Sequence, residues 1–212
     1  RILSDIGRIA TSSADLDQKL HRFIEVVMRG MEKDGASIFL LDRPGKNVAL
    51  AAAVGLNQES IGRLTFPLGS GLAGWVAQQK VPLALFDPFS DPRFQYVPET
   101  GIARFRSLVA APIMDEESCL GVIFVLSIQP WNATTAELTL LTTAANQVSG
   151  VIKSSLLLQS IQDRLAELAT IHEIGMALTS TLDLNQLLSR IATSSTEALR
   201  SQGCTIRPWH LP

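Results

Sequence analysis

The sequence has few of the residues that build metal and redox sites. Its 212 residues include two cysteines and three histidines. Cys119 and Cys204 are far apart in the chain, which gives neither a disulfide framework nor a zinc motif. Cys119 lies in an apolar run, so we expect a small buried side chain rather than a reactive thiol. No two histidines have metal-ligand spacing, so we expect no metal site and no haem ligand.

The sequence also lacks a charge of one sign and a long apolar run. Charged residues make up 18% of the chain, and the net charge is −2. Lys and Arg are scattered, so we expect no basic surface for nucleic acid or for an anionic membrane. No apolar run reaches the roughly 18 residues of a membrane span, and the start does not resemble a secretory signal. We therefore expect a cytoplasmic location, no nucleic-acid partner and no direct membrane insertion.

Catalytic motifs are missing as well. We find no nucleophile elbow, Walker motif or kinase signature, so the sequence predicts no enzyme. The stretch Gly69–Gly74 fits G-x-G-x-x-G, with Asp91 at a suitable distance. Dinucleotide binding needs this loop in a parallel βαβ unit, whereas the surrounding elements have an antiparallel pattern. We expect instead a tight turn that begins a closely packed helix, whose free N–H groups suit a ligand's anionic group.

The sequence does contain apolar residues in two kinds of segment, some with the spacing of a helix and some with the pattern of a strand. Apolar residues make up 46% of the chain, enough for a sizeable core. Helical spacing predicts a helix over 16–31, capped by Asp15, a short helix over 72–79, and a long helix over 133–179 that Asn132 would cap. Extended segments are expected at 36–41, 48–54, 64–68, 82–86, 107–113 and 119–127, the last two forming a hairpin.

The helix expected over 133–179 is longer than one small domain can cover. Apolar residues follow 3–4 spacing over 138–152 and again over 158–171, after a slip at Ser154-Ser155. The surplus apolar stripe predicts burial against a second chain, and hence a homodimer through the terminal helices. The alternative is one helix that folds back on its own domain.

A repeat organises the chain. At a shift of 168 positions (174 − 6 = 168), Ile6-Gly7 matches Ile174-Gly175, and residues 35–38 match residues 203–206. The unit at the start of the chain therefore begins again near residue 168. The second copy lacks most of its sheet and cannot build that core alone. We predict a complete domain over 1–155, a linker or signalling helix over 156–180, and an incomplete start of a second copy over 168–212.

The order of these elements resembles the GAF domain family over residues 1–155. The motifs that carry the resemblance are Ala36–Asp42, Gly69–Ala77, Asp91–Phe94 and Arg106–Ile113. Tyr96–Gly101 is similar to a subgroup found in the nitrogen-branch phosphoenolpyruvate phosphotransferase and in nitrogen-fixation activators. The resemblance implies an α+β fold of the GAF/PAS-like kind. Such a fold has a central antiparallel sheet of about five or six strands, terminal helices on one face and a loop-rich roof on the other.

The resemblance also implies a function. GAF domains bind cyclic nucleotides, bilins, haem or small metabolites, or only dimerise, and they precede kinases, cyclases and transcription-activating ATPases. The residues typical of cyclic-nucleotide and bilin binding are missing, so the cofactor stays unknown. We expect a bacterial signal-transduction module that senses an unknown small-molecule ligand and signals through its C-terminal helix to a downstream output domain. The alternatives are a ligand-free structural dimerisation module and a catalytic GAF domain such as a methionine sulfoxide reductase.

The irregular stretch 87–105, which we name the roof segment, is the expected binding region because such long connections are usually functional. Its aromatic side chains either line a pocket or plug the roof onto the sheet, and the sequence leaves both open. Arg106 is suited to a ligand's anion unless it pairs with Asp87 or Asp91. The candidate ligand-binding residues are Trp75, Phe86, Asp87, Phe94, Tyr96, Arg106 and Ser107.

Overall fold

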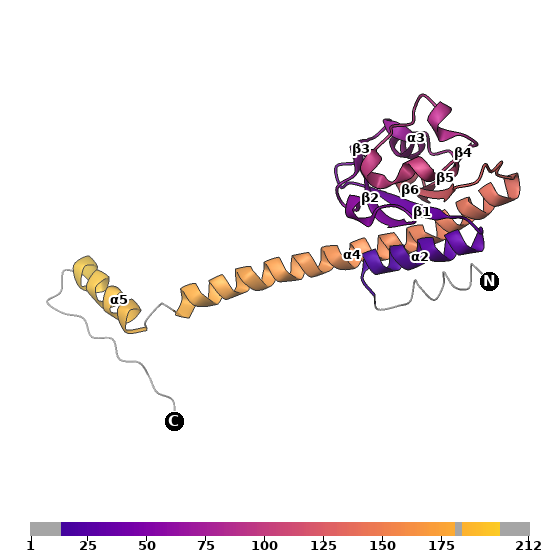
Figure 1. Cartoon of the computed structure of the whole chain (residues 1–212). Helices are drawn as coiled ribbons and strands as arrows, with labels where there is room; N and C mark the ends of the chain where they lie inside the picture. The colour runs from indigo at the N-terminus through magenta and orange to yellow at the C-terminus, as the bar shows by residue number, and fades with distance from the viewer. Residues whose placement is uncertain (1–13, 181–183, 200–212) are drawn as a thin grey trace. The chain divides into compact units, whose positions relative to one another are not determined.

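A six-stranded sheet forms the centre of the globular domain (Figure 1). The computed structural model describes residues 14–180 and 184–199. The strand order is β3-β2-β1-β6-β5-β4, and all neighbouring strands are antiparallel, which confirms the predicted α+β fold. The strands are β1 Gly35–Leu41, β2 Asn47–Val54, β3 Thr65–Pro67, β4 Leu83–Leu85, β5 Ser107–Asp115 and β6 Ser118–Ser127. The helices are α2 Leu16–Gly30, α3 Gly71–Gln79, α4 Thr135–Ser180 and α5 Leu184–Leu199, with 3-10 turns at Gln58–Ser60, Pro88–Ser90, Pro98–Thr100 and Ile102–Arg104.

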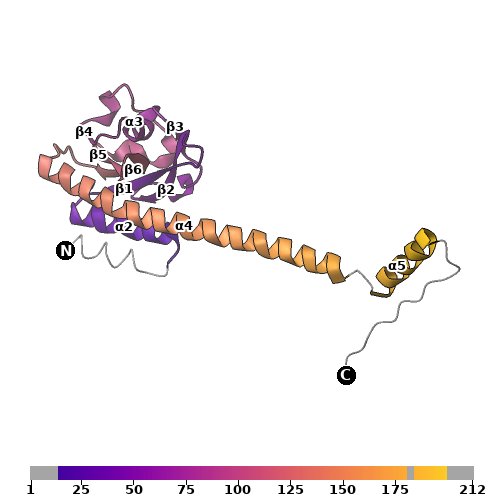
Figure 2. The same ribbon diagram turned by 180° about the vertical axis from the view of Figure 1, so that it is seen from behind.

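The sheet separates two apolar cores. One lies between the sheet and helices α2 and α4, which run along the same face (Figures 1 and 2). The other lies between the sheet, α3 and the roof segment. Successive side chains of a strand point to opposite faces, so a strand covered on both sides has to be apolar throughout. On β1, for example, Ala36 and Ile38 belong to the helix side and Phe39 to the roof side.

A β-bulge in β2 decides which of its residues reach the roof side. Ile38 pairs with Ala52 and Phe39 with Leu50, so Ala51 has no partner on β1. The extra residue shifts the alternation of side chains. As a result, both Leu50 and Ala53 belong to the core beneath the roof.

The two terminal helices begin with side-chain caps. Asp15 accepts a hydrogen bond from the backbone N–H of Gln18 at 2.8 Å, which confirms the predicted cap of α2. The prediction of Asn132 as the cap of α4 is wrong. Thr134 and Glu137 form a capping box, in which Glu137 N donates to Thr134 Oγ1 at 3.2 Å and Thr134 N donates to Glu137 Oε2 at 2.8 Å.

The glycine-rich stretch is the expected tight turn before α3. Gly71 has a φ of 63°, and a β-carbon there would meet the ring of Phe66 at 3.2 Å. A β-carbon on Gly74 would overlap the carbonyl oxygen of Pro67. Glycine is therefore required by the turn and by the close approach of α3 to β3. The antiparallel pairing of the sheet excludes the parallel crossover that dinucleotide binding by this motif requires.

The apolar side chains of helix α4 are buried in its first part and exposed in its later part. Val151 and Ile152 are 5% and 1% exposed and are its last buried residues among those described. Ser154-Ser155, where the 3–4 spacing of apolar residues is interrupted, comes shortly after these two residues. Beyond it the large apolar side chains are between 41% and 61% exposed: Leu156, Leu157, Leu158, Ile161, Leu165, Leu168 and Ile171.

The chain divides into two compact units, residues 1–157 and 158–212. In the second unit α5 begins at Leu184, and in the first α2 begins at Leu16, which is the repeat shift seen in the sequence (184 − 16 = 168). The strand expected at 203–206 lies outside the described residues, as do residues 1–13, so the second copy stays a prediction. Among the described helices, none combines the length and apolarity needed to cross a membrane.

Candidate functional site

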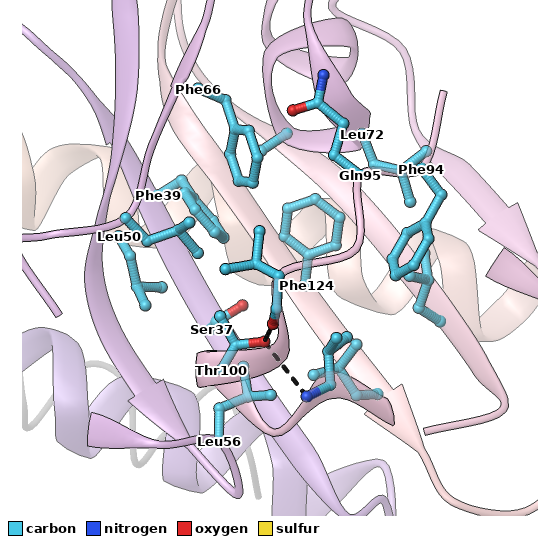
Figure 3. Close-up of a pocket in the computed structure, with 16 residues that line it drawn as sticks. Ser37, Phe39, Leu50, Leu56, Phe66, Leu72, Phe94, Gln95, Thr100 and Phe124 are labelled. Atoms are coloured by element: carbon cyan, nitrogen blue, oxygen red, sulfur yellow. Dashed lines mark hydrogen bonds between the residues drawn. The ribbon is translucent and has the colours of Figure 1, made fainter. Parts of the chain in front are cut away.

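A cavity of about 80 Å³ lies between the sheet and the roof segment (Figure 3). Strands β1, β2, β5 and β6 form its floor, β3 and the start of α3 form its walls, and residues of the roof segment cover it. Its larger lining side chains are Phe39, Leu50, Phe66, Leu72, Phe94 and Phe124.

Four phenylalanine rings surround this cavity. The ring centroid of Phe39 lies 5.9 Å from that of Phe66 and 5.7 Å from that of Phe124, the latter pair nearly perpendicular at 75°. Phe94 adds a fourth ring from the roof. None of the described lining residues is charged. Because an unpaired charge is costly in an apolar site, the cavity suits an uncharged molecule.

The size of the cavity limits what fits. An engineered apolar cavity that binds benzene has a volume of about 150 Å³. The cavity under the roof segment has about 80 Å³. A molecule of only a few non-hydrogen atoms therefore fits without movement, and a larger one requires the roof segment to shift.

Three lining residues carry polar side chains. Thr100 is 5% exposed, and its hydroxyl is already paired: it donates to Val97 O at 2.7 Å and accepts from Ile102 N at 3.2 Å (Figure 3). Gln95 is exposed, and its side-chain amide donates to Ser70 Oγ at 2.9 Å. Ser37 on β1 is 2% exposed. Its hydroxyl takes part in none of the side-chain hydrogen bonds found in the described part of the chain.

Polar contacts hold the roof segment above the sheet. On one side, Asn57 donates from its backbone N–H to Thr100 O and from its side chain to Glu99 O, both at 2.9 Å. On the other side, Gln95 is bonded to Ser70 at the start of α3. These contacts lie on both sides of the stretch that covers the cavity, so they fix the distance between the roof segment and the sheet.

Arg93 of the roof segment forms an ion pair within that segment and contacts Trp75 of α3. Nε of Arg93 donates to Oδ1 of Asp91 at 2.8 Å, and Nη2 of Arg93 donates to Oδ2 of Asp91 at 2.5 Å. The guanidinium carbon of Arg93 also lies 4.1 Å from the ring centroid of Trp75, a cation–π arrangement. The hydrogen bonds from Arg93 and its charge lower the pKa of Asp91, so this carboxylate is ionised at neutral pH.

The aromatic residues predicted as ligand contacts occupy different places. Of these, Phe94 lines the cavity. Trp75 is half-buried beneath Arg93, and Phe86 and Tyr96 are 54% and 52% exposed, so none of the three is among the lining residues. Phe89, which the sequence reasoning did not single out, has its ring centroid 4.9 Å from that of Phe94.

The polar candidates also lie outside the cavity lining. Asp87 caps the turn Pro88–Ser90, accepting from Phe89 N and Ser90 Oγ, and the latter bond is the main cause of its lowered pKa. Ser107 is fully buried and donates to Gln129 O at 2.9 Å, so its hydroxyl has a structural partner. Arg106 is exposed and forms no ion pair with Asp87 or with Asp91, which is paired with Arg93.

Sequence reasoning missed the floor of the cavity. Phe39, Leu50 and Phe124 lie in strands that are apolar on both faces, so the pattern alone did not show which side chains reach the roof. Ser37 did carry a signal, because it is a polar residue inside an apolar strand.

The described residues offer no reactive thiol at the cavity. Cys119 is 8% exposed and lies outside the lining, which confirms the expectation of a buried side chain. Burial raises its pKa, so the thiol is protonated and a poor nucleophile at neutral pH. Cys204 lies outside the described residues.

Comparisons with known proteins agree with this fold. The family model described as GAF domain matches residues 15–152. No curated protein matches the chain. The GAF domain of the Acinetobacter phosphoenolpyruvate-protein phosphotransferase is 32% identical, with a TM-score of 0.64, and the match covers 73% of this chain and 94% of that one. The predicted resemblance to GAF domains of phosphotransferases is thereby confirmed.

Two more distant structures share the fold. One is the free methionine-R-sulfoxide reductase of Neisseria meningitidis, 16% identical with a TM-score of 0.62, over 74% of this chain and 89% of that one. The other is part of a methyl-accepting chemotaxis protein, 21% identical with a TM-score of 0.60, over 74% of this chain and 98% of that one. The fold therefore occurs in signalling proteins and in enzymes.

Proposed function

The chain belongs to the GAF domain family, and from this we propose that it is a non-enzymatic regulatory module that senses a small uncharged molecule. The cavity beneath the roof segment is the proposed binding site. The observation that carries the proposal is an apolar cavity of about 80 Å³ ringed by four phenylalanines, with no charged residue among its described lining. Among candidate functions, small-molecule sensing fits such a site best.

The proposed signal passes through the sheet to α4. Phe124 on β6 lines the cavity, and its neighbours Ile123 and Val125 belong to the core on the other face. That core includes Val148 and Ile152 of α4. A shift of β6 caused by an occupant of the cavity would therefore change how α4 packs. In the parent protein, which we place in the cytoplasm, α4 would pass this change to a downstream output domain.

The exposed stripe of α4 supports pairing with a second copy of the chain. Leu158, Ile161, Leu165 and Leu168 follow 3-4-3 spacing and are between 46% and 61% exposed. This spacing is that of a coiled-coil seam, and two such stripes bury each other. We propose a homodimer through this segment, defined as residues 158–171.

One observation favours a second candidate function. A cavity of about 80 Å³ is smaller than most ligand pockets, which occupy about 300–1,000 Å³. In the second candidate the phenylalanine rings fill the domain, nothing binds, and the domain only dimerises its parent protein.

The two functions are separated by a binding measurement on the full chain. We expect isobutane to shift, in a saturable way, the methyl NMR signals of the lining residues Leu50, Leu72 and Leu126. Ala73→Leu places a larger side chain in the cavity and should abolish these shifts. The control Ala84→Leu adds the same volume at an exposed position of β4 and should preserve them. Absence of saturable shifts in the unmodified protein, both with isobutane and with 2-propanol of the same branched shape, would exclude the sensing function and leave the dimerisation module.

A further inference from the structure

Ser37 is an unusual residue for the floor of this cavity. It lies in the central strand β1, between Ala53 of β2 and Phe124 of β6. It is 2% exposed and lines the cavity beside Phe39 (Figure 3). Its hydroxyl has no protein partner among the hydrogen bonds of the described residues. No side-chain nitrogen or oxygen of the described residues is both fully enclosed and unpaired, so Ser37 Oγ faces the open space of the cavity and not packed protein. Ser37 thus places one hydrogen-bonding group on the floor of an otherwise mainly apolar cavity.

The other buried serines of the described sheet do have partners. Ser107 donates to Gln129 O at 2.9 Å, and Ser127 is 3.4 Å from Asp34 Oδ2. Thr100, the other buried polar residue of the lining, is paired with Val97 and Ile102. Ser37 therefore differs from them in that its hydroxyl is available to a molecule in the cavity.

A water molecule is a poor partner for Ser37. A buried water is held by two to four hydrogen bonds, about three on average, and apolar cavities remain dry. Besides Ser37, the lining has two polar side chains, Thr100 and Gln95, both of which already bond to protein groups, and its other side chains are apolar. An organic molecule with one polar group satisfies Ser37 and also fills the space between the phenylalanine rings.

We propose that Ser37 is the residue that selects the ligand. The ligand is then a small, uncharged molecule with an apolar body and a single hydrogen-bonding group, such as a short-chain alcohol or carbonyl compound, and that group bonds to Ser37 Oγ. The inference rests on the proposed sensing function, because it names the chemistry recognised by the same cavity.

The test compares two probes that differ by one hydroxyl. Isobutane and 2-propanol have the same branched shape, with a methyl in one where the other has a hydroxyl. Affinities of both are measured from methyl NMR titrations of the full chain and of Ser37→Ala. We expect Ser37→Ala to lower the affinity for 2-propanol by about 3- to 10-fold, the range for one hydrogen bond. The affinity for isobutane should stay the same or rise slightly.

Two further variants make the result specific. Ser107→Ala removes a buried serine hydroxyl outside the cavity and should leave the affinities of both probes unchanged. Ser37→Cys keeps nearly the same shape with a weaker hydrogen-bonding group and should give an intermediate affinity for 2-propanol.

The possible failures are distinguishable. If both probes bind but Ser37→Ala changes their affinities equally or not at all, Ser37 does not select the ligand and the inference is overturned, while the sensing function stands. If Ser107→Ala weakens 2-propanol as much as Ser37→Ala does, the inference is overturned as well. If neither probe shifts the lining methyls, the proposed binding site itself is wrong.

Discussion

Lys153 of α4 is bonded to Asp115 at the end of β5, with Nζ 3.0 Å from Oδ1 and 2.9 Å from Oδ2. Lys153 directly follows Ile152, the last buried residue of α4 among those described. On the other face of the sheet, Lys80 at the end of α3 donates to the carbonyl oxygen of Glu117 in the same β5–β6 turn. This turn therefore connects the helix that lines the cavity with the point where α4 becomes exposed.

The ion pair should hold the last covered turn of α4 in place. We predict that Lys153→Met increases amide hydrogen exchange at residues 153–157 and leaves the strands unaffected. Its hydrogen bonds to Asp115 raise the pKa of Lys153, so the stabilisation is fully present below the ordinary lysine pKa and is lost only as the pH rises through the raised value. Lys46→Met, at an exposed lysine whose side chain has no bond in the described structure, is the control. Equal exchange in both variants would contradict the role of this ion pair.

The turn before α3 should not tolerate a side chain. We predict that Gly74→Ala lowers the free energy of unfolding by about 1–3 kcal/mol, because its β-carbon overlaps the carbonyl of Pro67. Gly150→Ala is a matched control within α4, where no atom lies within 4 Å of the new β-carbon. There the same change should raise the free energy of unfolding by about 0.5–1 kcal/mol. Denaturant titration measures both, and a Gly74→Ala protein as stable as the unmodified one would refute the close packing.

Acid should release the contact between the roof segment and α3. The pKa of Asp91 is lowered by Arg93, so its contribution to stability is present above the ordinary aspartate pKa and is lost as the pH falls through the lower folded value. We predict a change in Trp75 fluorescence over that acidic range, measured in a Trp131→Phe, Trp209→Phe background. Asp91→Asn should show the released spectrum at neutral pH and no acidic step. Identical titrations of the two proteins would show that Asp91 does not hold Arg93 over Trp75.

The exposed stripe of α4 should control dimerisation. We predict that Leu165→Ser or Leu168→Ser raises the dimer dissociation constant by about tenfold or more, since each leucine loses over 1.4 kcal/mol of apolar burial. Glu167→Ser, between them on the helix, should have little effect. Sedimentation equilibrium of the full chain measures the constant. A monomer in the unmodified protein would rule out pairing through residues 158–171.

The fold could largely be predicted from the spacing of apolar residues. The nearly continuous apolar runs at 107–113 and 119–127 indicate strands covered on both faces, and the polar turn between them indicates a hairpin. The bulge at Ala51 was not predictable, because an alanine run gives no sign of where the alternation shifts. The cap of α4 was predictable in principle, since Thr134 and Glu137 have capping-box spacing, but Asn132 offered a similar signal.

The site was harder to predict than the fold. Aromatic residues in an irregular segment pointed to the roof, and Phe94 does line the cavity. The sequence makes Arg106 a candidate because its guanidinium stands where an apolar strand begins, and Ser107 because its hydroxyl is next to Arg106. The structure places Arg106 at the surface and Ser107 against Gln129 O, both outside the cavity lining. When a strand is covered on both faces, tertiary packing decides which face borders a cavity. A single sequence does not carry this information.

The most direct test of the account asks whether an occupant of the cavity changes α4. Hydrogen exchange of residues 153–171 is measured in the full chain with and without saturating isobutane, and again in Ala73→Leu. We predict that isobutane changes exchange in this segment by about 5-fold in the unmodified protein and not in the variant. Isobutane that shifts the cavity methyls but leaves exchange along α4 unaltered would contradict the account.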